Sequence, residues 1–322
     1  MATAAAESQR AVHSRAPRPG RDSTGRTRWR RKVVDALTAG GFLVPNMVLM
    51  TVFLLLPLVF AFVISFQRSE SIGKPKWIGL TNFQHLLNDA VFWTVLRNTV
   101  LFTLITVPLE MALGLGVAVL LNGVLPARTF FRAVIFLPLV LAGVTTGLLG
   151  SWMFDQYNGF VNKALAVIGI AGPAWQSDGT LALISIVLVT LWMRLGFNMI
   201  IYLAGLQGVN PELHEAARVD GASSWTVFRR ITVPLLGPST FFLLIMNMIY
   251  SFQVFDTVFA MTGGGPGFST TMLVTYAYKT GFDEHGSGEL GYAAAIGVVI
   301  YLITLTFTVL QWRFSRTRDE AG

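Results

Sequence analysis

The sequence contains no cysteine and few charged residues. Among its 322 residues, only 13% are Asp, Glu, Lys or Arg. The absence of cysteine excludes disulfide bridges, thiolate metal sites and cysteine nucleophiles. The low charge, combined with a hydrophobic fraction of 53%, is too apolar for an ordinary soluble domain and favours a membrane protein.

Motifs for ATP binding and for catalysis are also missing. Neither a G-x-x-x-x-G-K-[ST] phosphate loop nor a G-x-S-x-G nucleophile elbow occurs in the sequence. The four histidines are scattered, and none stands at helical metal-binding spacing from another. The glycine-rich run Gly263–Gly267 lacks the lysine of a phosphate loop, so we interpret it as a flexible loop. We therefore predict no ATPase activity, no metal site and no cofactor in this chain.

Six apolar runs reach the length of about 20 residues that a membrane-spanning helix needs. They predict an all-α, polytopic membrane protein with six transmembrane helices. Proline and glycine inside such runs are tolerated in bundled membrane helices. The runs are Phe42–Phe66, Thr94–Leu121, Ala133–Phe154, Leu181–Leu206, Thr232–Phe259 and Leu290–Trp312.

Lysine and arginine are distributed unevenly between these runs. Nine of the 24 lie before Val33, in a segment that we interpret as a disordered basic tail over residues 1–35. A nucleic-acid-binding arm is the alternative, and the long apolar run that follows disfavours a cleaved signal peptide. With the N-terminus inside, 17 Lys and Arg lie in cytoplasmic segments, six lie outside, and Arg194 lies within a run. This bias predicts that both termini are cytoplasmic, and without the tail the ratio is only eight to six.

One charged segment, Glu215–Pro238, interrupts the apolar sequence and faces the cytoplasm in this topology. Pro211 and the early glutamates Glu212 and Glu215 indicate the start of a helix, and Asp220-Gly221 indicates a turn. We predict a short helix, a turn and a second helix at the membrane surface, which is an arrangement suited to docking a soluble partner. An interfacial amphipathic helix without a partner is the alternative.

The order of residues in and around this segment matches a known pattern. The matching residues are Leu203-Ala204-Gly205-Leu206-Gln207, Pro211, Glu215-Ala216-Ala217, Asp220-Gly221-Ala222, Phe228, Ile231 and Pro234. They resemble the EAA motif of the membrane subunits of binding-protein-dependent ABC importers. Asn210, where the family usually has Ile, and His214, where Tyr is common, depart from the pattern.

Further matches extend the resemblance to the sugar-importing branch of that family. They are Trp77 to Phe83, Phe92-Trp93, Asn98-Thr99 and Gly264-Gly265-Pro266. The sequence is most similar to the first permease of maltose-type and glycerol-3-phosphate-type systems. The first 35 residues or so lie outside the resemblance.

The resemblance implies a permease subunit of an ATP-driven importer in a bacterial plasma membrane. The solute would be a sugar or sugar-like molecule, either a neutral oligosaccharide or a glycerol-3-phosphate-type polyol phosphate. The implied partners are a second permease in a heterodimer, two ATPase subunits that bind ATP and Mg²⁺, an external solute-binding protein and membrane lipid, with no nucleic acid.

The resemblance also implies a division of the chain and a set of coupling residues. Residues 36–93 would form the first transmembrane helix and an outer loop, and residues 94–313 a five-helix core with the coupling loop at 208–238. Residues 314–322 would form a cytoplasmic tail. The residues that would couple the loop, as a coupling helix, to an ATPase are Glu215, Ala216, Ala217, Asp220, Gly221 and Phe228.

Polar residues inside the apolar runs are candidates for a solute path, because ionisable groups at membrane depth cost about 2.5–3.5 kcal/mol on insertion scales. Arg194 could pair with Glu110, or it could hold a phosphate or a sugar hydroxyl. Tyr250 and Gln253, three residues apart, would share a helix face and offer groups that suit a sugar, or they could bond between helices. Arg194, Tyr250 and Gln253 match, by their offset from the EAA motif, the sugar-site stretches of maltose-type permeases, and Leu139 and Gly143 occupy the matching stretch of the third run. With Asn198 and with Asn247, which extends the face of Tyr250, the candidate path residues are Arg194, Asn198, Asn247, Tyr250, Gln253, Leu139 and Gly143.

Two functions of other classes compete with this interpretation. An ion-gradient-driven secondary transporter would be expected to contain a carboxylate relay or repeated halves, and Glu110 is the one clear carboxylate well inside a run. A membrane enzyme would need clustered His and Asp or Glu at an interface, which the sequence does not display. The sequence leaves the identity of the solute open.

Overall fold

The computed structural model of the protein describes residues 38, 40–69, 74–123, 125–282 and 289–319. The predicted basic tail over residues 1–35 lies outside the described residues, as do residues 320–322 of the predicted C-terminal tail. The chain divides into two units, with the boundary between Val59 and Phe60. Within the described residues the structure is helical apart from one short two-stranded sheet, which confirms the predicted all-α fold class.

The first candidate membrane span is the helix Gly40–Ile64, which has a mean hydropathy of 2.9. Within it, the π-helical turn η1 (Thr51–Leu55) leads into α2 (Leu56–Ile64). Pro57 stands at the start of α2 and lacks the backbone N–H that a regular helix would use there. The wider π turn just before Pro57 accommodates the proline without ending the helix.

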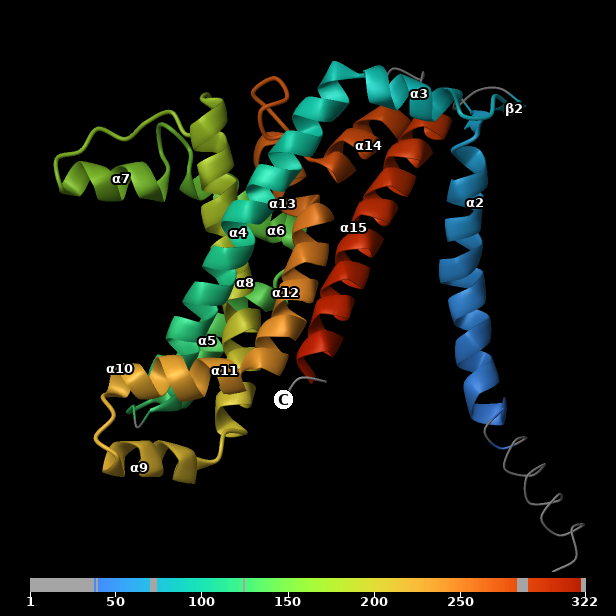
Figure 1. Ribbon diagram of the computed structural model, residues 1–322. Helices are drawn as coiled ribbons and strands as arrows, with labels where there is room; N and C mark the ends of the chain where they lie inside the picture. Colours follow the sequence, from blue (N-terminus) through green and yellow to red (C-terminus); the bar gives the residue numbers. More distant parts are fainter. Residues whose placement is uncertain (1–37, 39, 70–73, 124, 283–288, 320–322) are drawn as a thin grey trace, which may run out of the picture. The chain divides into compact units, whose positions relative to one another are not determined.

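The second unit begins with the last turns of α2 and continues with two short strands and a bundle of helices (Figure 1). Strands β1 (Gln67–Arg68) and β2 (Lys76–Trp77) pair antiparallel. The helices, in chain order, are α3 (Thr81–Asn88), α4 (Ala90–Asn122), α5 (Arg128–Val140), α6 (Gly143–Met153), α7 (Phe160–Val167), α8 (Gly179–Gln207), α9 (Pro211–Val219), α10 (Ser224–Val227), η2 (Phe228–Thr232), α11 (Val233–Leu235), α12 (Gly237–Phe252), α13 (Asp256–Thr262), α14 (Leu273–Gly281) and α15 (Leu290–Asp319).

Within the described residues, four helices are long and apolar enough to cross a membrane. They are Gly40–Ile64, Ala90–Asn122, Gly179–Gln207 and Leu290–Gln311. The number rises to six when each of two bent helix pairs counts as one span. The structure therefore fits a polytopic membrane protein, and the six predicted runs all correspond to helices.

Two of the predicted runs are not the single straight helices that we expected. The third is broken between Arg128–Val140 and Gly143–Met153, with a bend of 101°. Its break follows Pro138, where the backbone of Leu141 and Ala142 becomes extended. The fifth bends by 65° between Ser224–Leu235 and Gly237–Phe252, at a Gly-Pro pair. Both breaks follow from residues that weaken or interrupt the helical hydrogen-bond ladder.

The fifth run also ends earlier than predicted. Helix α12 stops at Phe252, Gln253 is its C-cap residue, and a separate helix α13 begins at Asp256. The segment after α13 is irregular up to Met272 and then forms α14. Gln253 is thus displaced from the regular helix that carries Tyr250.

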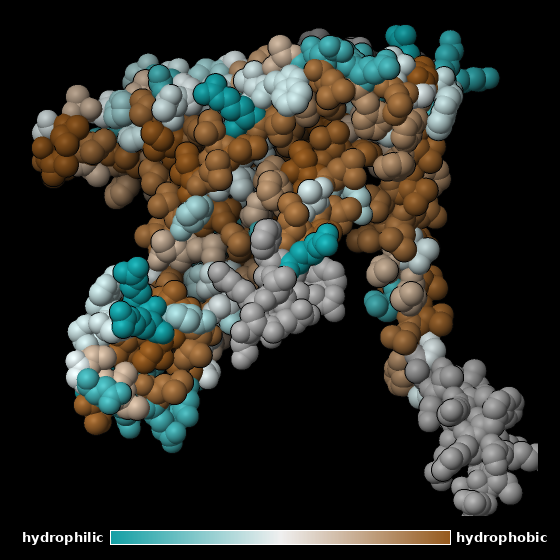
Figure 2. Space-filling model, in the orientation of Figure 1, coloured by the Kyte–Doolittle hydropathy of each residue, from teal (hydrophilic) through white to brown (hydrophobic). Residues whose placement is uncertain are grey.

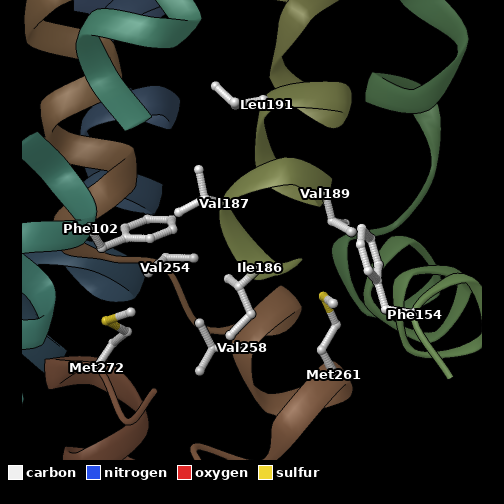
Figure 3. Close-up of a cluster of buried hydrophobic side chains, with 10 residues drawn as sticks. All are labelled: Phe102, Phe154, Ile186, Val187, Val189, Leu191, Val254, Val258, Met261 and Met272. Carbon is white, nitrogen blue, oxygen red and sulfur yellow. The ribbon is translucent and has the colours of Figure 1, made fainter. Parts of the chain in front are cut away.

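Three apolar clusters hold the second unit together. Figure 3 shows the first, in which Phe102 of α4 and Ile186 of α8 lie near Val258 and Met261 of α13. The second cluster joins α4, α14 and α15, and the third joins the far ends of α4 and α8 to α12. Helices α4 and α8 approach very closely at Gly114, which has no side chain. A Cβ placed on this residue would collide with Asn198. These clusters fix α4, α8 and α12 around the polar residues described below.

The surface of the second unit is divided by hydropathy (Figure 2). Hydrophobic residues cover the flanks of the helices, and hydrophilic residues gather over α9 and α10. Large apolar side chains such as Leu104 and Leu120 of α4 are exposed on these flanks. An apolar flank of this extent suits contact with lipid, whereas α9 and α10 suit an aqueous phase.

Candidate functional site

The loop over residues 208–238, which we call the EAA loop, folds as a helix, a turn and a second helix, as the sequence predicted. The side chain of Asn210 accepts a hydrogen bond of 3.0 Å from the backbone N–H of Glu212 and so caps α9. At the other end, Gly221 has a φ of 79°, and the N–H of Ala222 donates to the carbonyl of Ala217 at 2.9 Å. Asn210 departs from the family pattern, and capping gives it a role that an isoleucine lacks.

The return half of the EAA loop is also built by local contacts. The hydroxyl of Ser223 accepts a hydrogen bond of 3.3 Å from the N–H of Thr226 and caps α10. The rings of Trp225 and Phe228 stack with centroids 5.6 Å apart. Helix α10 then passes through the π-helical η2 into α11, so the loop continues as helical turns up to the bend before α12.

Helix α9 is exposed along most of its length, and only His214 and Ala217 in it are half-buried. Leu213 and Val219 are 46% and 87% exposed, although both are apolar. Among the predicted coupling residues, Glu215, Ala216, Asp220 and Gly221 are exposed, and Ala217 and Phe228 are half-buried. Exposed large apolar side chains that gather on one segment are typical of a surface that a protein partner covers.

A cavity lies between α9 and the rest of the second unit. Its volume is about 230 Å³, and its lining residues are Val119, Asn122, Leu206, His214, Arg218, Ser224, Val227, Phe228 and Thr232. Across it, Nε2 of His214 lies 3.1 Å from Oγ1 of Thr232, within hydrogen-bond distance for either tautomer. His214, the second departure from the family pattern, thus connects α9 directly to η2.

The candidate path residues near the middle of α8 form a buried polar cluster. Arg194 of α8 donates from Nη2 to Oδ1 of Asn247 on α12 at 2.8 Å. Asn247 in turn donates from Nδ2 to Oδ1 of Asn198 at 2.7 Å. Oε2 of Glu110, on α4, lies 4.0 Å from Nε of Arg194. The structure therefore places Arg194 beside Glu110, which is one of the two arrangements that the sequence left open.

The other candidate path residues lie around this cluster. Tyr250 is half-buried on α12, and Gln253, at the C-cap of that helix, is exposed. Leu139 and Gly143 belong to the bent pair α5–α6 and are half-buried. Gly143 lies so close to Asp256 of α13 that a Cβ there would be 2.5 Å from a carboxylate oxygen. The structure thus brings Arg194, Asn198, Asn247 and Tyr250 together and places the other three on neighbouring segments.

Sequence reasoning missed a cluster of one carboxylate and two tyrosines at the end of the second unit that lies away from the EAA loop. Oδ1 of Asp89 caps α4 by accepting from the N–H of Val91 at 2.8 Å. Its Oδ2 accepts from the hydroxyls of Tyr276 and of Tyr292, the second at 2.7 Å. These tyrosines are 187 and 203 residues away in the chain, so no local pattern announces the contact.

The pKa values in this cluster keep Asp89 charged. Burial raises the pKa of Asp89, but hydrogen bonds from Tyr276, Tyr292 and the backbone outweigh that effect and leave the pKa below its ordinary value. Burial, and then the hydrogen bond to Asp89, raise the pKa of Tyr276, so its hydroxyl remains a donor. An ionised acceptor with two neutral donors therefore ties α4, α14 and α15 together.

Asparagine in place of Asp89 is expected to lower the thermal stability of the protein. Asparagine still caps a helix, but it accepts less strongly from two hydroxyls, so the loss is expected to be about 1 kcal/mol, the net contribution of a typical hydrogen bond. Because the pKa of Asp89 is lower in the folded protein than its ordinary value of 3.8, this stabilisation is fully present at pH values above 3.8. It is lost as the pH falls through the lower pKa of the folded protein. Thermal unfolding of the purified protein at neutral and at acidic pH measures both effects.

Asp178 offers a matched control for that experiment. It caps α8 by accepting from the N–H groups of Thr180 and Leu181, each at 2.9 Å. Asparagine at position 178 should leave stability nearly unchanged, since Asn and Asp cap helices about equally well. Equal losses at positions 89 and 178 would argue against a role for the tyrosine hydrogen bonds.

Two segments that matched the family separately, Asn98-Thr99 and the stretch around Gly264-Gly265-Pro266, lie next to each other at this end of the second unit. Asn98 donates from Nδ2 to the carbonyl of Phe268 at 2.8 Å, and Oγ1 of Thr99 accepts from the N–H of Leu273 at 3.1 Å. The hydroxyl of Thr271 donates to the carbonyl of Gly264 at 2.8 Å. The glycine-rich segment, interpreted from the sequence as flexible, is thus held by hydrogen bonds to itself and to α4.

Comparisons with known proteins now complement this geometry. Residues 110–319 match the family described as "Binding-protein-dependent transport system inner membrane component". The chain is 36% identical over 295 residues to the sulfoquinovosyl glycerol transport system permease protein SmoG of Agrobacterium fabrum, a match that covers 91% of this chain and 94% of that protein. It is 32% identical over 279 residues to the trehalose/maltose transport system permease protein MalF of Thermococcus litoralis, covering 86% and 93% of the two chains.

A solved structure resembles the whole fold. It is a chain of a bacterial alginate ABC transporter in complex with an alginate pentasaccharide-bound periplasmic protein. The TM-score is 0.78, and the match covers 90% of this chain and 97% of that chain. Because the sequence identity is 23%, this likeness concerns the fold alone.

Proposed function

Because the chain belongs to the family of binding-protein-dependent transport system inner membrane components, we propose that it is the permease subunit of an ATP-driven ABC importer for a sugar or sugar-like solute. The observation that carries this proposal is the EAA loop, an exposed helix–turn–helix that joins α8 to α12 within the matched region. The transport of sulfoquinovosyl glycerol and of trehalose or maltose by similar proteins supports the solute class. The chain is the membrane component and leaves ATP hydrolysis to a partner.

The family and the exposed surfaces support an assembly. The exposed apolar and acidic side chains of α9 would dock on one of two ATPase subunits, which would bind ATP and Mg²⁺. A second permease would complete a heterodimer, and an external solute-binding protein would deliver the solute, as a periplasmic protein accompanies the alginate transporter. The distribution of lysine and arginine supports both termini in the cytoplasm of a bacterium.

Movement of α9 would reach the solute path through two connections. His214 contacts Thr232 of η2, and η2 continues through α11 into α12. Helix α12 carries Asn247 and Tyr250 of the buried polar cluster. ATP binding, by closing the ATPase subunits on α9, would thereby shift α12 against α8 and change access to the path.

The solute path would run past Tyr250 and Gln253, with Leu139 and Gly143 on the facing segments. Arg194, Asn198 and Asn247 would form the wall behind Tyr250, since all three are buried. The solute would be a neutral oligosaccharide or a polyol phosphate of the glycerol-3-phosphate type. Tyr250 offers an aromatic face and Gln253 an amide, which are groups that bind hydroxyl-rich solutes.

The ion-gradient-driven alternative loses its main support in the structure. Glu110, the carboxylate that it would use, lies 4.0 Å from a guanidinium nitrogen of Arg194. A carboxylate neutralised in this way is not poised to bind a transported ion. The similar proteins are likewise permeases of ABC systems.

Co-purification tests the proposed function. The full chain, tagged and extracted from its own membranes in mild detergent, is expected to bring with it an ATPase subunit and a second permease. The isolated complex should hydrolyse ATP, and the rate should rise when the external binding protein and its solute are added. A chain that purifies alone from membranes in which the ATPase is present would refute the assignment.

A further inference from the structure

Arg194 is enclosed by the protein itself, although its buried Nε atom has no hydrogen-bond partner in the described part of the chain. The residue is 8% exposed, and its Nη2 atom donates to Asn247 at 2.8 Å. The guanidinium carbon lies 4.2 Å from the ring centre of Tyr250 and 4.7 Å from that of Phe197. The cation is therefore held between two aromatic rings, an arrangement that is attractive because each ring face carries negative potential.

The amide groups next to Arg194 are equally occupied. Asn247 accepts from Arg194 and donates to Asn198, and Asn198 donates from Nδ2 to the carbonyl of Arg194 at 3.1 Å. Both asparagines are fully buried. A closed ring of hydrogen bonds thus joins α8 to α12 and occupies Nη2 of Arg194, while the burial of the residue leaves little of its guanidinium open to a solute.

Glu110 supplies the balancing charge from α4. It is 2% exposed, and its Oε2 faces Nε of Arg194 at 4.0 Å. Glu110 and Gly114 are one helical turn apart on α4, as Arg194 and Asn198 are on α8. Gly114 lets the backbones of the two helices approach at Asn198, which keeps the opposite charges within reach one turn away. A buried charge without such a partner would be strongly unfavourable.

We propose that Glu110 and Arg194 are positioning residues: the pair neutralises itself inside the bundle and supports the ring of Tyr250, so that the solute meets Tyr250 and not the guanidinium. This inference rests on the proposed function, because it assigns roles within the solute path. It makes Arg194 the support of the binding surface, and it makes Glu110 necessary although no solute touches it.

Four variants of the full transporter separate a positioning role from direct solute binding by Arg194 and from a role in stability alone. Glu110→Gln and Arg194→Met each leave one buried charge alone. Glu110→Gln/Arg194→Met removes both charges and keeps a long side chain beneath Tyr250, since methionine packs well on aromatic rings. Glu110→Gln/Arg194→Ala removes both charges and also the support. The measurements are the yield of intact complex, its thermal midpoint, and the apparent KM and maximal rate for uptake of labelled maltose and of labelled sn-glycerol-3-phosphate.

The expected pattern is specific to a positioning role. Each single variant should lower the yield of intact complex by about tenfold or more, and both double variants should recover most of it. The double variant with methionine should keep the apparent KM within about threefold of the original, because the ring stays supported. The double variant with alanine should raise the apparent KM by about three- to tenfold at an unchanged maximal rate, because the contact of the 194 side chain with the ring of Tyr250 is lost.

Other outcomes overturn the proposal. A raised KM in both double variants would mean that the guanidinium binds the solute directly. An unchanged KM in both would mean that the pair only stabilises the bundle, and double variants no better assembled than the single ones would mean that the charges do not compensate each other. If neither labelled probe enters cells with the original protein, neither maltose nor sn-glycerol-3-phosphate is the solute, while the yields and thermal midpoints still decide whether the charges form a pair.

Discussion

Lysine in place of Glu215 is expected to abolish ATP-driven uptake while the permease remains in the membrane at its normal level. Glu215 lies exposed on α9, so its replacement does not disturb the core of the protein. In the assembled transporter the same carboxylate would be covered by the ATPase, where reversing a paired charge costs about 2–5 kcal/mol and lowers coupling by about 30-fold or more. Uptake per unit of membrane-inserted protein, with an immunoblot for the protein level, measures the effect.

A milder substitution at position 215 and an assembly assay show whether the lost charge explains that result. Glutamine at position 215 retains hydrogen bonding without the charge, so it should lose only part of the activity. The complex with lysine should also release its ATPase more readily during purification. Normal uptake by the lysine variant would show that α9 does not dock through this residue.

Valine in place of Gly114 is expected to prevent assembly of the protein almost completely. A Cβ at this position would lie 2.4 Å from Cβ of Asn198 and 3.1 Å from its backbone carbonyl carbon, so α4 and α8 would have to move apart. Overpacking of a tight core costs about 1–3 kcal/mol or more, and this site also holds Glu110 against Arg194. The yield of monodisperse protein after detergent extraction measures the loss.

Gly116 is the matched control for Gly114, because it lies two residues further along the same helix. Nothing lies within 4 Å of a Cβ placed there, so valine should be accepted with little effect on yield. A comparable loss at both positions would indicate that α4 simply tolerates no valine. In that case the close approach of α4 and α8 would not be the cause.

Local patterns in the sequence predicted the elements of this protein well. The length of the apolar runs predicted where helices form, and Pro211 with Gly221 predicted the two ends of α9. Proline and glycine were read as tolerated inside the runs, but Pro138 and the Gly237-Pro238 pair mark bends of 101° and 65°. Whether a proline kinks a helix or breaks it depends on the packing around it, which a single sequence does not contain.

Contacts between distant segments were the part that the sequence did not reveal. Composition identified Arg194 and Glu110 as unusual, but their separation of 84 positions left two roles open until the helices were placed side by side. Asp89 carried no signal at all, because both of its tyrosine partners come from the last quarter of the chain. The coupling and path residues themselves remain proposals, since they concern partners that lie outside this chain.

Solute uptake by the purified, reconstituted transporter tests the central claim most directly. Vesicles that contain the complete complex are loaded with ATP and Mg²⁺, and the binding protein with its labelled solute is added outside. The account predicts accumulation that requires internal ATP, the binding protein and an intact Glu215, and that is indifferent to proton or sodium gradients. Accumulation driven by an ion gradient in the absence of ATP would contradict it.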